Sequence, residues 1–215
     1  MSIRVNIGCG QSPTDGWHNY DNSWSIRFAR IPLLCQILFK SSLFSKQQRE
    51  FVTFVKKSHI RWADAKKCIP EENGTVDVVY SSHMLEHLDK EDASKFLKNV
   101  RRVLRSGGIV RIAVPDIRHH VENYLQDGDA NKFIDKTLLS SSNPKTLFEK
   151  LKYLTVGDRH HQWMYDGNSL CRLLSSEGFI KPCEMKAGTT MIKYPEPLNL
   201  EEGMPESIFV EALNP

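Results

Sequence analysis

The chain has 215 residues, of which 40% are hydrophobic and 26% charged, a composition typical of a globular protein with a sizeable core. Its net charge of +3 is small beside 29 basic and 26 acidic residues, so the charge does not predict a nucleic-acid partner. The sequence contains neither an apolar stretch of about eighteen residues nor a secretory signal, so we expect one cytoplasmic domain over residues 1–215.

The first part of the chain alternates short apolar runs with turns. Residues 3–7 and 17–20 predict two strands joined by a turn-rich loop, and residues 59–62 and 76–80 predict two more. Between the second and third of these strands, residues 24–57 mix apolar and basic side chains and predict a helical insertion. Two alternatives stay open for this insertion: a lid that packs on its own domain, or an amphipathic element that contacts an anionic membrane surface.

The second part of the chain continues the alternation of helices and strands. The predicted elements are a helix at 89–105 stopped by Ser106-Gly107-Gly108, a strand at 109–114, a helical insertion at about 117–156, a helix at 166–176, and strands at 179–187 and 207–213. Strands that alternate with helices predict a mostly parallel sheet covered on both faces. The fold class is therefore α/β.

Two glycines follow the first predicted strand, at the place where a doubly wound sheet binds its ligand. The dinucleotide fingerprint requires a third glycine and an acidic residue about twenty positions later. Here Asp21 follows Gly10 by only eleven positions. This spacing favours a ribose-bearing ligand without a pyrophosphate, and it disfavours an NAD-dependent oxidoreductase.

A family resemblance is carried by five segments: VNIGCG, the YD at Tyr20-Asp21, WADA at 62–65, DVVYSSHMLEHL at 77–88 and VRRVLRSGGIVRIAVPD at 100–116. In this order they resemble the successive motifs of the class I S-adenosylmethionine-dependent methyltransferases. The HxLEHL motif, with HxWMYD at 161–166, resembles a bacterial group of small, methyltransferase type 11-like proteins. The resemblance implies a Rossmann-like, doubly wound, mostly parallel seven-stranded sheet whose last strand is antiparallel.

The resemblance also implies how the first half of the site binds S-adenosylmethionine. The Gly8-Cys9-Gly10 turn would leave room for the methionine part of the cofactor, and Asp21 would bind both ribose hydroxyls. Ser12 stands where the family usually has its third glycine, which puts the geometry around the cofactor carboxylate in doubt. For Asp21 an alternative stays open, since Asp often caps a following turn.

Four further residues are implied to complete the cofactor site. Asp64 and the Ala65 backbone would hold the amino edge of the adenine, and Ser81 and Ser82 would line the site near the sulfonium. Asp64 also has an alternative role, because Asp commonly begins turns. S-adenosylhomocysteine is the implied product.

Two histidines are predicted to be catalytic, His83 and His161. Methyl transfer is a displacement that mainly needs alignment and the exclusion of water, but an alcohol or amine acceptor must also lose a proton. A histidine suits that task because its pKa is near neutral. Within HxLEHL, Glu86 could orient an imidazole; the alternative is that Glu86 or His87 only fastens the start of the next helix.

The HxWMYD motif lies on a predicted loop that concentrates titratable and aromatic groups, which suggests acceptor recognition. We expect His161 to face the pocket. The alternative is structural: Trp163 and Tyr165 would anchor the loop on the core, and Asp166 would cap the helix that follows.

We expect no metal site. The adjacent pairs His119-His120 and His160-His161 project in different directions, and no carboxylate joins them at ligand spacing. The five cysteines are widely spaced and form no C-x-x-C pair, so they predict neither a zinc site nor a disulfide framework.

The predicted function is metal-independent transfer of a methyl group from S-adenosylmethionine to an oxygen or nitrogen nucleophile of a small-molecule or glycan-like acceptor. The alternative is a non-catalytic module that binds S-adenosylmethionine or a nucleotide for assembly or sensing. Fold alone does not choose the acceptor.

Overall fold

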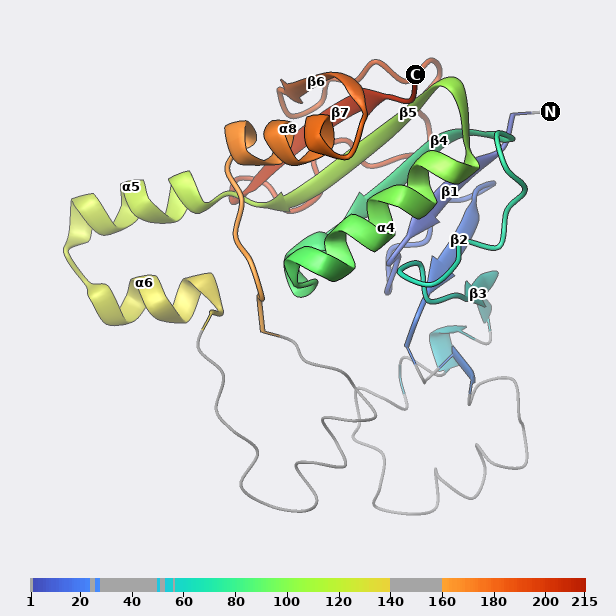
Figure 1. Ribbon diagram of the computed structural model, residues 1–215. Coiled ribbons are helices and arrows are strands. Elements are labelled where there is room, and N and C mark those ends of the chain that lie inside the picture. The colour runs from blue at the N-terminus through green and yellow to red at the C-terminus, as the bar shows by residue number, and fades with distance from the viewer. Residues whose placement is uncertain (1, 24–25, 28–49, 51–52, 56, 140–159) are drawn as a thin grey trace.

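The protein is built on one central sheet, seen in a computed structural model that describes residues 2–23, 26–27, 50, 53–55, 57–139 and 160–215 (Figure 1). The strand order of this seven-stranded sheet is β3-β2-β1-β4-β5-β7-β6. The strands are β1 (Arg4–Ile7), β2 (His18–Asp21), β3 (Ile60–Trp62), β4 (Val76–Ser82), β5 (Leu104–Pro115), β6 (Ile180–Met185) and β7 (Ser207–Leu213). Strands β1 to β5 pair in parallel, and β7 is antiparallel to both of its neighbours. The predicted fold class is confirmed.

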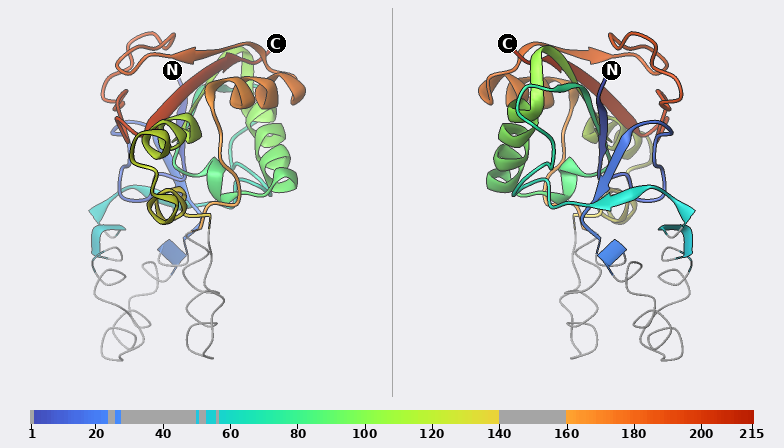
Figure 2. Two further views of the ribbon diagram at one scale, coloured as in Figure 1. Left: turned by 90° about the vertical axis from the view of Figure 1, so that its left-hand side faces the viewer. Right: turned by 90° about the vertical axis from the view of Figure 1, so that its right-hand side faces the viewer.

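The helical elements are η1 (Leu85–His87), α4 (Lys90–Val103), α5 (Ile117–Asp127), α6 (Ala130–Thr137) and α8 (Gly167–Ser176). Helices α5 and α6 lie beyond the carboxyl end of β5 (Figures 1 and 2). Most of the predicted insertion at 24–57, and residues 140–156 of the second one, lie outside the described residues. No helix in the described ranges is long and apolar enough to cross a membrane.

One face of the sheet is covered by α4 and α8 (Figure 1). Helix α4 begins at Asp89, whose side chain accepts a hydrogen bond from the Asp92 amide at 2.8 Å, as an N-cap does. Its Phe96, Leu97 and Val100 recur at helical spacing and are fully buried against the strands. Burial of this apolar stripe explains why the segment is helical.

The opposite face is covered in a different way. Side chains alternate along β4, so that Val79 faces the helices while Val78 and Tyr80 face the other side. There they pack against Ile192 and Leu198, which lie between β6 and β7 in a segment without regular helix. In the described part of the chain, an irregular segment therefore covers this face of the sheet, as helices cover the first face.

Strand β5 begins earlier than the sequence predicts. The expected stop at Ser106-Gly107-Gly108 does not separate helix from strand, because β5 starts at Leu104, directly after α4. Leu104 pairs with Val76, and Gly107 takes a positive φ of 72° within the strand. The two glycines thus shape the beginning of a strand instead of a connecting turn.

The antiparallel strand β7 is fastened by an ion pair inside the sheet. Arg111 and Glu211 lie directly opposite each other on β5 and β7, with Nη1 and Oε1 2.7 Å apart and both side chains 0% exposed. The guanidinium also donates to the carbonyls of Thr189 and Leu200, each at 3.0 Å. The pair therefore fixes the register of β7 and holds the irregular covering segment on the sheet.

We expect Glu211→Gln to lower the free energy of unfolding by about 3–5 kcal/mol, because it leaves a buried guanidinium without its counter-charge. Glu91→Gln is the matched control: Glu91 pairs with Lys95 at 2.8 Å, but its side chain is 80% exposed, and an exposed pair contributes less than about 1 kcal/mol. Urea denaturation followed by circular dichroism measures both. Equal losses in the two variants would contradict the role given to Arg111.

Candidate functional site

The carboxyl end of β1 runs into a tight turn at Gly8 and Gly10. Both residues have positive φ, 72° and 49°, and the Gly8 amide donates to the Tyr20 carbonyl of β2 at 2.8 Å. A Cβ on Gly8 would lie 2.7 Å from Cγ of Met84, whereas a Cβ on Gly10 would meet no atom of the described residues within 4 Å. Gly8 is therefore required by packing against the loop after β4, whereas no described residue occupies the space beside Gly10.

Asp21, the last residue of β2, is held beneath this turn. Its Oδ2 accepts from the Gly10 amide at 3.1 Å and its Oδ1 from the Ser23 amide at 2.7 Å. Burial raises the pKa of Asp21, and the two amide hydrogen bonds oppose that shift. The bond to Ser23 is the turn-capping role expected as an alternative. Since each carboxylate oxygen can accept more than one hydrogen bond, the oriented group can still bind two hydroxyls.

Cys9 contributes packing at the same turn. Its side chain is buried in a cluster with Ile26, Val55 and Ile60. Burial raises the pKa of the Cys9 thiol to about 12, so the thiol is neutral at physiological pH. Any contact of Cys9 with a ligand would therefore involve its backbone.

Asp64 follows β3 at the same edge of the sheet. Its Oδ2 lies 3.3 Å from the Lys67 ammonium, but its Oδ1 is buried with no hydrogen-bond partner among the described residues. A buried acceptor without a donor is costly, and an amino group of a ligand would satisfy it. The neighbouring Ala65 carbonyl already accepts a hydrogen bond from Asn99 at 3.1 Å.

Ser81 and Ser82 end β4, the strand next to β1. Ser81 pairs with Ile7, so it lies beside the residue that precedes the glycine turn. Its side chain is 1% exposed, and its hydroxyl has no hydrogen-bond partner in the part of the chain that the structure describes. The ends of β1, β2, β3 and β4 thus gather the predicted cofactor residues at one edge.

His83 follows β4 in a conformation that side chains rarely adopt, with φ +48°. Its Nδ1 lies 3.4 Å from Glu86 Oε1, and its Nε2 lies 3.1 Å from the Ser207 hydroxyl at the start of β7. The Glu86 carboxylate raises the pKa of His83. Backbone strain of this kind is concentrated at functional sites, which makes His83 a candidate on structural grounds as well.

The HxLEHL and HxWMYD motifs meet at Glu86. The amides of Gln162 and Trp163 both donate to the Glu86 carbonyl, at 2.7 and 3.1 Å. This contact brings the ring of His161 to 5.1 Å from that of His87, centroid to centroid. His161 is buried, and burial lowers its pKa.

The rest of the HxWMYD motif has mostly structural roles. Asp166 caps α8 in a reciprocal capping box with Ser169, as the structural alternative predicts. Tyr165 is buried in the core, whereas Trp163 is 42% exposed, with the Lys90 ammonium 4.1 Å from its ring centroid. Tyr165 therefore anchors the segment, and Trp163 does not.

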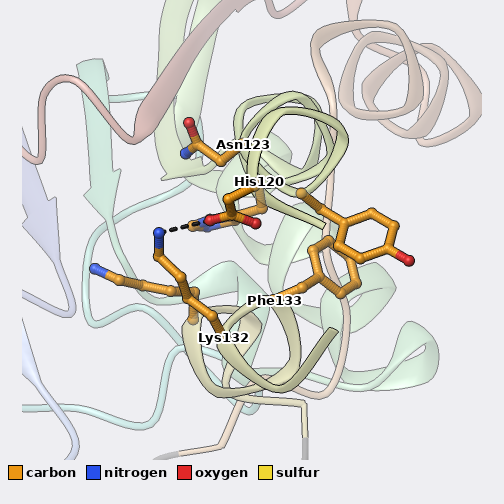
Figure 3. A pocket seen from close by; sticks show the side chains of 7 residues that line it. His120, Asn123, Lys132 and Phe133 are labelled. Carbon is orange, nitrogen blue, oxygen red and sulfur yellow. Dashed lines mark hydrogen bonds and ion pairs between the residues drawn. The ribbon is translucent and has the colours of Figure 1, made fainter. Parts of the chain in front are cut away.

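A separate small cleft lies between α5 and α6 (Figure 3). His120 and Asn123 line it from α5, and Phe133 and Lys132 from α6, where Lys132 pairs with Asp127 at 2.6 Å. Burial lowers the pKa of His120. None of the residues predicted to bind the cofactor or to be catalytic lines this cleft, so it is distinct from the edge formed by β1 to β4.

Sequence comparison links part of the chain to a family. Residues 40–112, which include β4, α4 and the beginning of β5, match the family model of a methyltransferase domain. No curated protein is significantly similar to the chain in sequence.

Solved structures share the fold over the whole chain. A methyltransferase from Methanosarcina mazei has a TM-score of 0.53 at 13% identity, over 99% of this chain and 92% of its own. A protein from Pyrococcus horikoshii has a TM-score of 0.53 at 14% identity, over 99% and 82%. A Thermotoga maritima protein, described as a possible histamine N-methyltransferase, has a TM-score of 0.51 at 16% identity, over 100% and 83%. At these identities the likeness shows the fold alone.

We expect Asp21→Asn to weaken the binding of S-adenosylhomocysteine by about 10- to 100-fold, because hydrogen bonds to a charged acceptor contribute about 1.5–3 kcal/mol. Isothermal titration calorimetry measures the affinity. Asp15→Asn is the control, since Asp15 is an exposed acidic residue on the loop that leads to β2. Unchanged affinity in folded Asp21→Asn would contradict the assignment of Asp21 to the ribose hydroxyls of the cofactor.

Proposed function

We propose that this chain is a class I S-adenosylmethionine-dependent methyltransferase that methylates an oxygen or nitrogen nucleophile of a small-molecule or glycan-like acceptor. Residues 40–112 match the family model of a methyltransferase domain, and the fold is shared with solved methyltransferase structures. The observation that carries the proposal is the edge where Asp21 is oriented by two amides and where, among the described residues, nothing fills the space beside Gly10 and nothing donates to Asp64 Oδ1. The fold relative described as a possible histamine N-methyltransferase is consistent with a small acceptor.

The proposed cofactor site follows from these contacts. Asp21 would accept hydrogen bonds from the ribose hydroxyls, and Asp64 Oδ1 would accept from the adenine amino group. Gly8, Gly10 and the Cys9 backbone would border the methionine part, with Ser81 and Ser82 near the sulfonium. When bound, S-adenosylmethionine supplies a methyl carbon that its positive sulfonium already activates. The protein has to align the acceptor and exclude water.

We place the proton acceptor at His83. Its Nε2 lies 3.1 Å from the Ser207 hydroxyl, which donates its own hydrogen to the Gly203 carbonyl at 3.0 Å, so an acceptor hydroxyl would take the place of Ser207 at Nε2. Its Nδ1 faces the Glu86 carboxylate at 3.4 Å, which would stabilise the imidazolium that forms when the ring takes a proton. The side chain is 38% exposed, so an acceptor can reach it.

His161 is the second catalytic candidate from the sequence, but it is less suited to take this proton. It is only 8% exposed, and burial lowers its pKa. We therefore expect His161 to act through its neighbours Glu86 and His87 instead of contacting the acceptor.

We expect His83→Gln to lower kcat by about 10²- to 10⁴-fold, because a positioned general base contributes about that much. Radiolabelled S-adenosylmethionine and a panel of small alcohols, amines and sugars measure the transfer. The affinity for S-adenosylhomocysteine should not change, because His83 is not among the residues assigned to the cofactor.

His18→Gln is the matched control. His18 is the first residue of β2 and Asp21 is the last, so the two lie at opposite ends of the strand. The side chain of His18 is 40% exposed. Equal turnover by the His83 and His18 variants would contradict the role of His83. If the panel yields no transfer by a wild-type protein that binds the cofactor, the proposed acceptor class is wrong.

A further inference from the structure

Glu86, His87 and His161 form a cluster that the proposed cofactor site does not use. Glu86 and His87 belong to η1, and His161 belongs to the segment before α8 that is fastened to the Glu86 carbonyl. Each residue offers one ligand atom, and these atoms all lie within 4.8 Å of one another. The 3-10 helix η1 and the segment before α8 thus place two imidazoles beside one carboxylate. The two elements are distant in sequence: His87 and His160, which are hydrogen-bonded, are 73 residues apart.

The Glu86 carboxylate is buried and has few partners for its charge. Its side chain is 1% exposed, and neither oxygen has a hydrogen-bond partner among the described residues. The imidazoles of His83 and His87 approach only Oε1, at 3.4 and 4.0 Å; within the described ranges no ion pair involves Oε2. Burying an ionised carboxylate costs several kcal/mol unless a cation or hydrogen-bond donors compensate for it. The site therefore favours an additional positive charge.

His87 is oriented in the way that a metal-binding histidine is. Its Nδ1 lies 3.1 Å from the His160 carbonyl oxygen, and a carbonyl can only accept, so Nδ1 carries the hydrogen. In the neutral ring the lone pair is then on Nε2, which is the nitrogen 4.0 Å from Glu86 Oε1. A backbone carbonyl that fixes the outer nitrogen of a histidine is a typical outer-shell contact of metal sites.

We propose that Glu86, His87 and His161 bind a divalent transition-metal ion of the Zn²⁺ type. Two imidazoles and one carboxylate suit Zn²⁺ or Fe²⁺, and three protein ligands leave a position open for water or for an oxygen of the acceptor. Bonds of about 2.0–2.2 Å require the ligand atoms to lie closer together than they do here, by roughly 1 Å. The side chain of His87 is 33% exposed and has room to make that adjustment.

This inference goes beyond the proposed function and differs from the expectation of no metal. That expectation concerned adjacent histidine pairs, whereas this cluster joins residues from two distant motifs. The two proposals can fail separately. Titration with the metal ion alone tests the metal site, and titration with S-adenosylhomocysteine tests the cofactor site.

The test uses the full chain without a histidine tag, stripped with a chelator. Calorimetric titration with Zn²⁺ should show saturable binding of one ion per chain, and Co²⁺ should give the visible absorption of a four- or five-coordinate ion. His161→Ala should weaken Zn²⁺ binding by more than the roughly 10- to 100-fold that outer-shell changes cost. Zn²⁺ should raise the Tm of the wild-type protein but not that of the variant.

His119→Ala is the matched control, because His119 also has a histidine neighbour, at 5.9 Å between ring centroids, but lies outside the cluster. It should bind Zn²⁺ like the wild-type protein. Should His161→Ala fail to fold, Glu86→Gln provides the second variant, and the Co²⁺ spectrum of the wild-type protein needs neither. Absence of saturable binding by the wild type, or equal affinity in folded wild type and His161→Ala, would overturn the proposal.

Discussion

Parallel pairing of β1 with β2 and β4 is the constraint on which the site depends. Because parallel strands end at the same edge of a sheet, Ile7, Asp21 and Ser81 come together although they are far apart in sequence. The glycine turn after β1 then bends back so that the Gly10 amide reaches the Asp21 carboxylate. The chemistry of this edge is therefore a consequence of strand order, and side chains at the opposite edge, such as His18, take no part in it.

Buried polar groups near β7 and buried polar groups at the carboxyl ends of the parallel strands have different surroundings. At the side of β7, Arg111 and Glu211 form a buried ion pair and the guanidinium also donates to two loop carbonyls, although Arg111 Nε has no hydrogen-bond partner among the described residues. At the carboxyl edge, Asp64 Oδ1, Ser81 Oγ and the Glu86 oxygens are buried without a hydrogen-bond partner among the described residues. Uncompensated polar groups in a well-packed protein are typical of sites that gain their partners from ligands. What differs is the charge: Arg111 is paired with Glu211 at 2.7 Å, whereas Glu86 has only the imidazoles of His83 and His87 near one of its oxygens, at 3.4 and 4.0 Å.

Much of the fold could be predicted from the sequence, because apolar periodicity and turn residues report local structure directly. The strand boundaries near Gly8 and Asp21 and the helix start at Asp89 follow from such signals. The start of β5 did not, since Ser106-Gly107-Gly108 resembles a stop signal, and only pairing with Val76 makes it strand. Likewise the Met84 contact that requires Gly8 depends on tertiary packing, as does the meeting of Glu86 with His161. The sequence singled out the histidines of HxLEHL and HxWMYD for proton transfer and acceptor recognition, and it did not predict that Glu86, His87 and His161 meet.

The measurement that tests the central claim most directly is a crystal structure of the full chain with S-adenosylhomocysteine. The structure described here predicts that the ribose hydroxyls lie within hydrogen-bond distance of the Asp21 carboxylate and that the adenine amino group lies on Asp64 Oδ1. A nucleoside bound elsewhere, or crystals at saturating ligand in which this edge of the sheet holds only water, would contradict it.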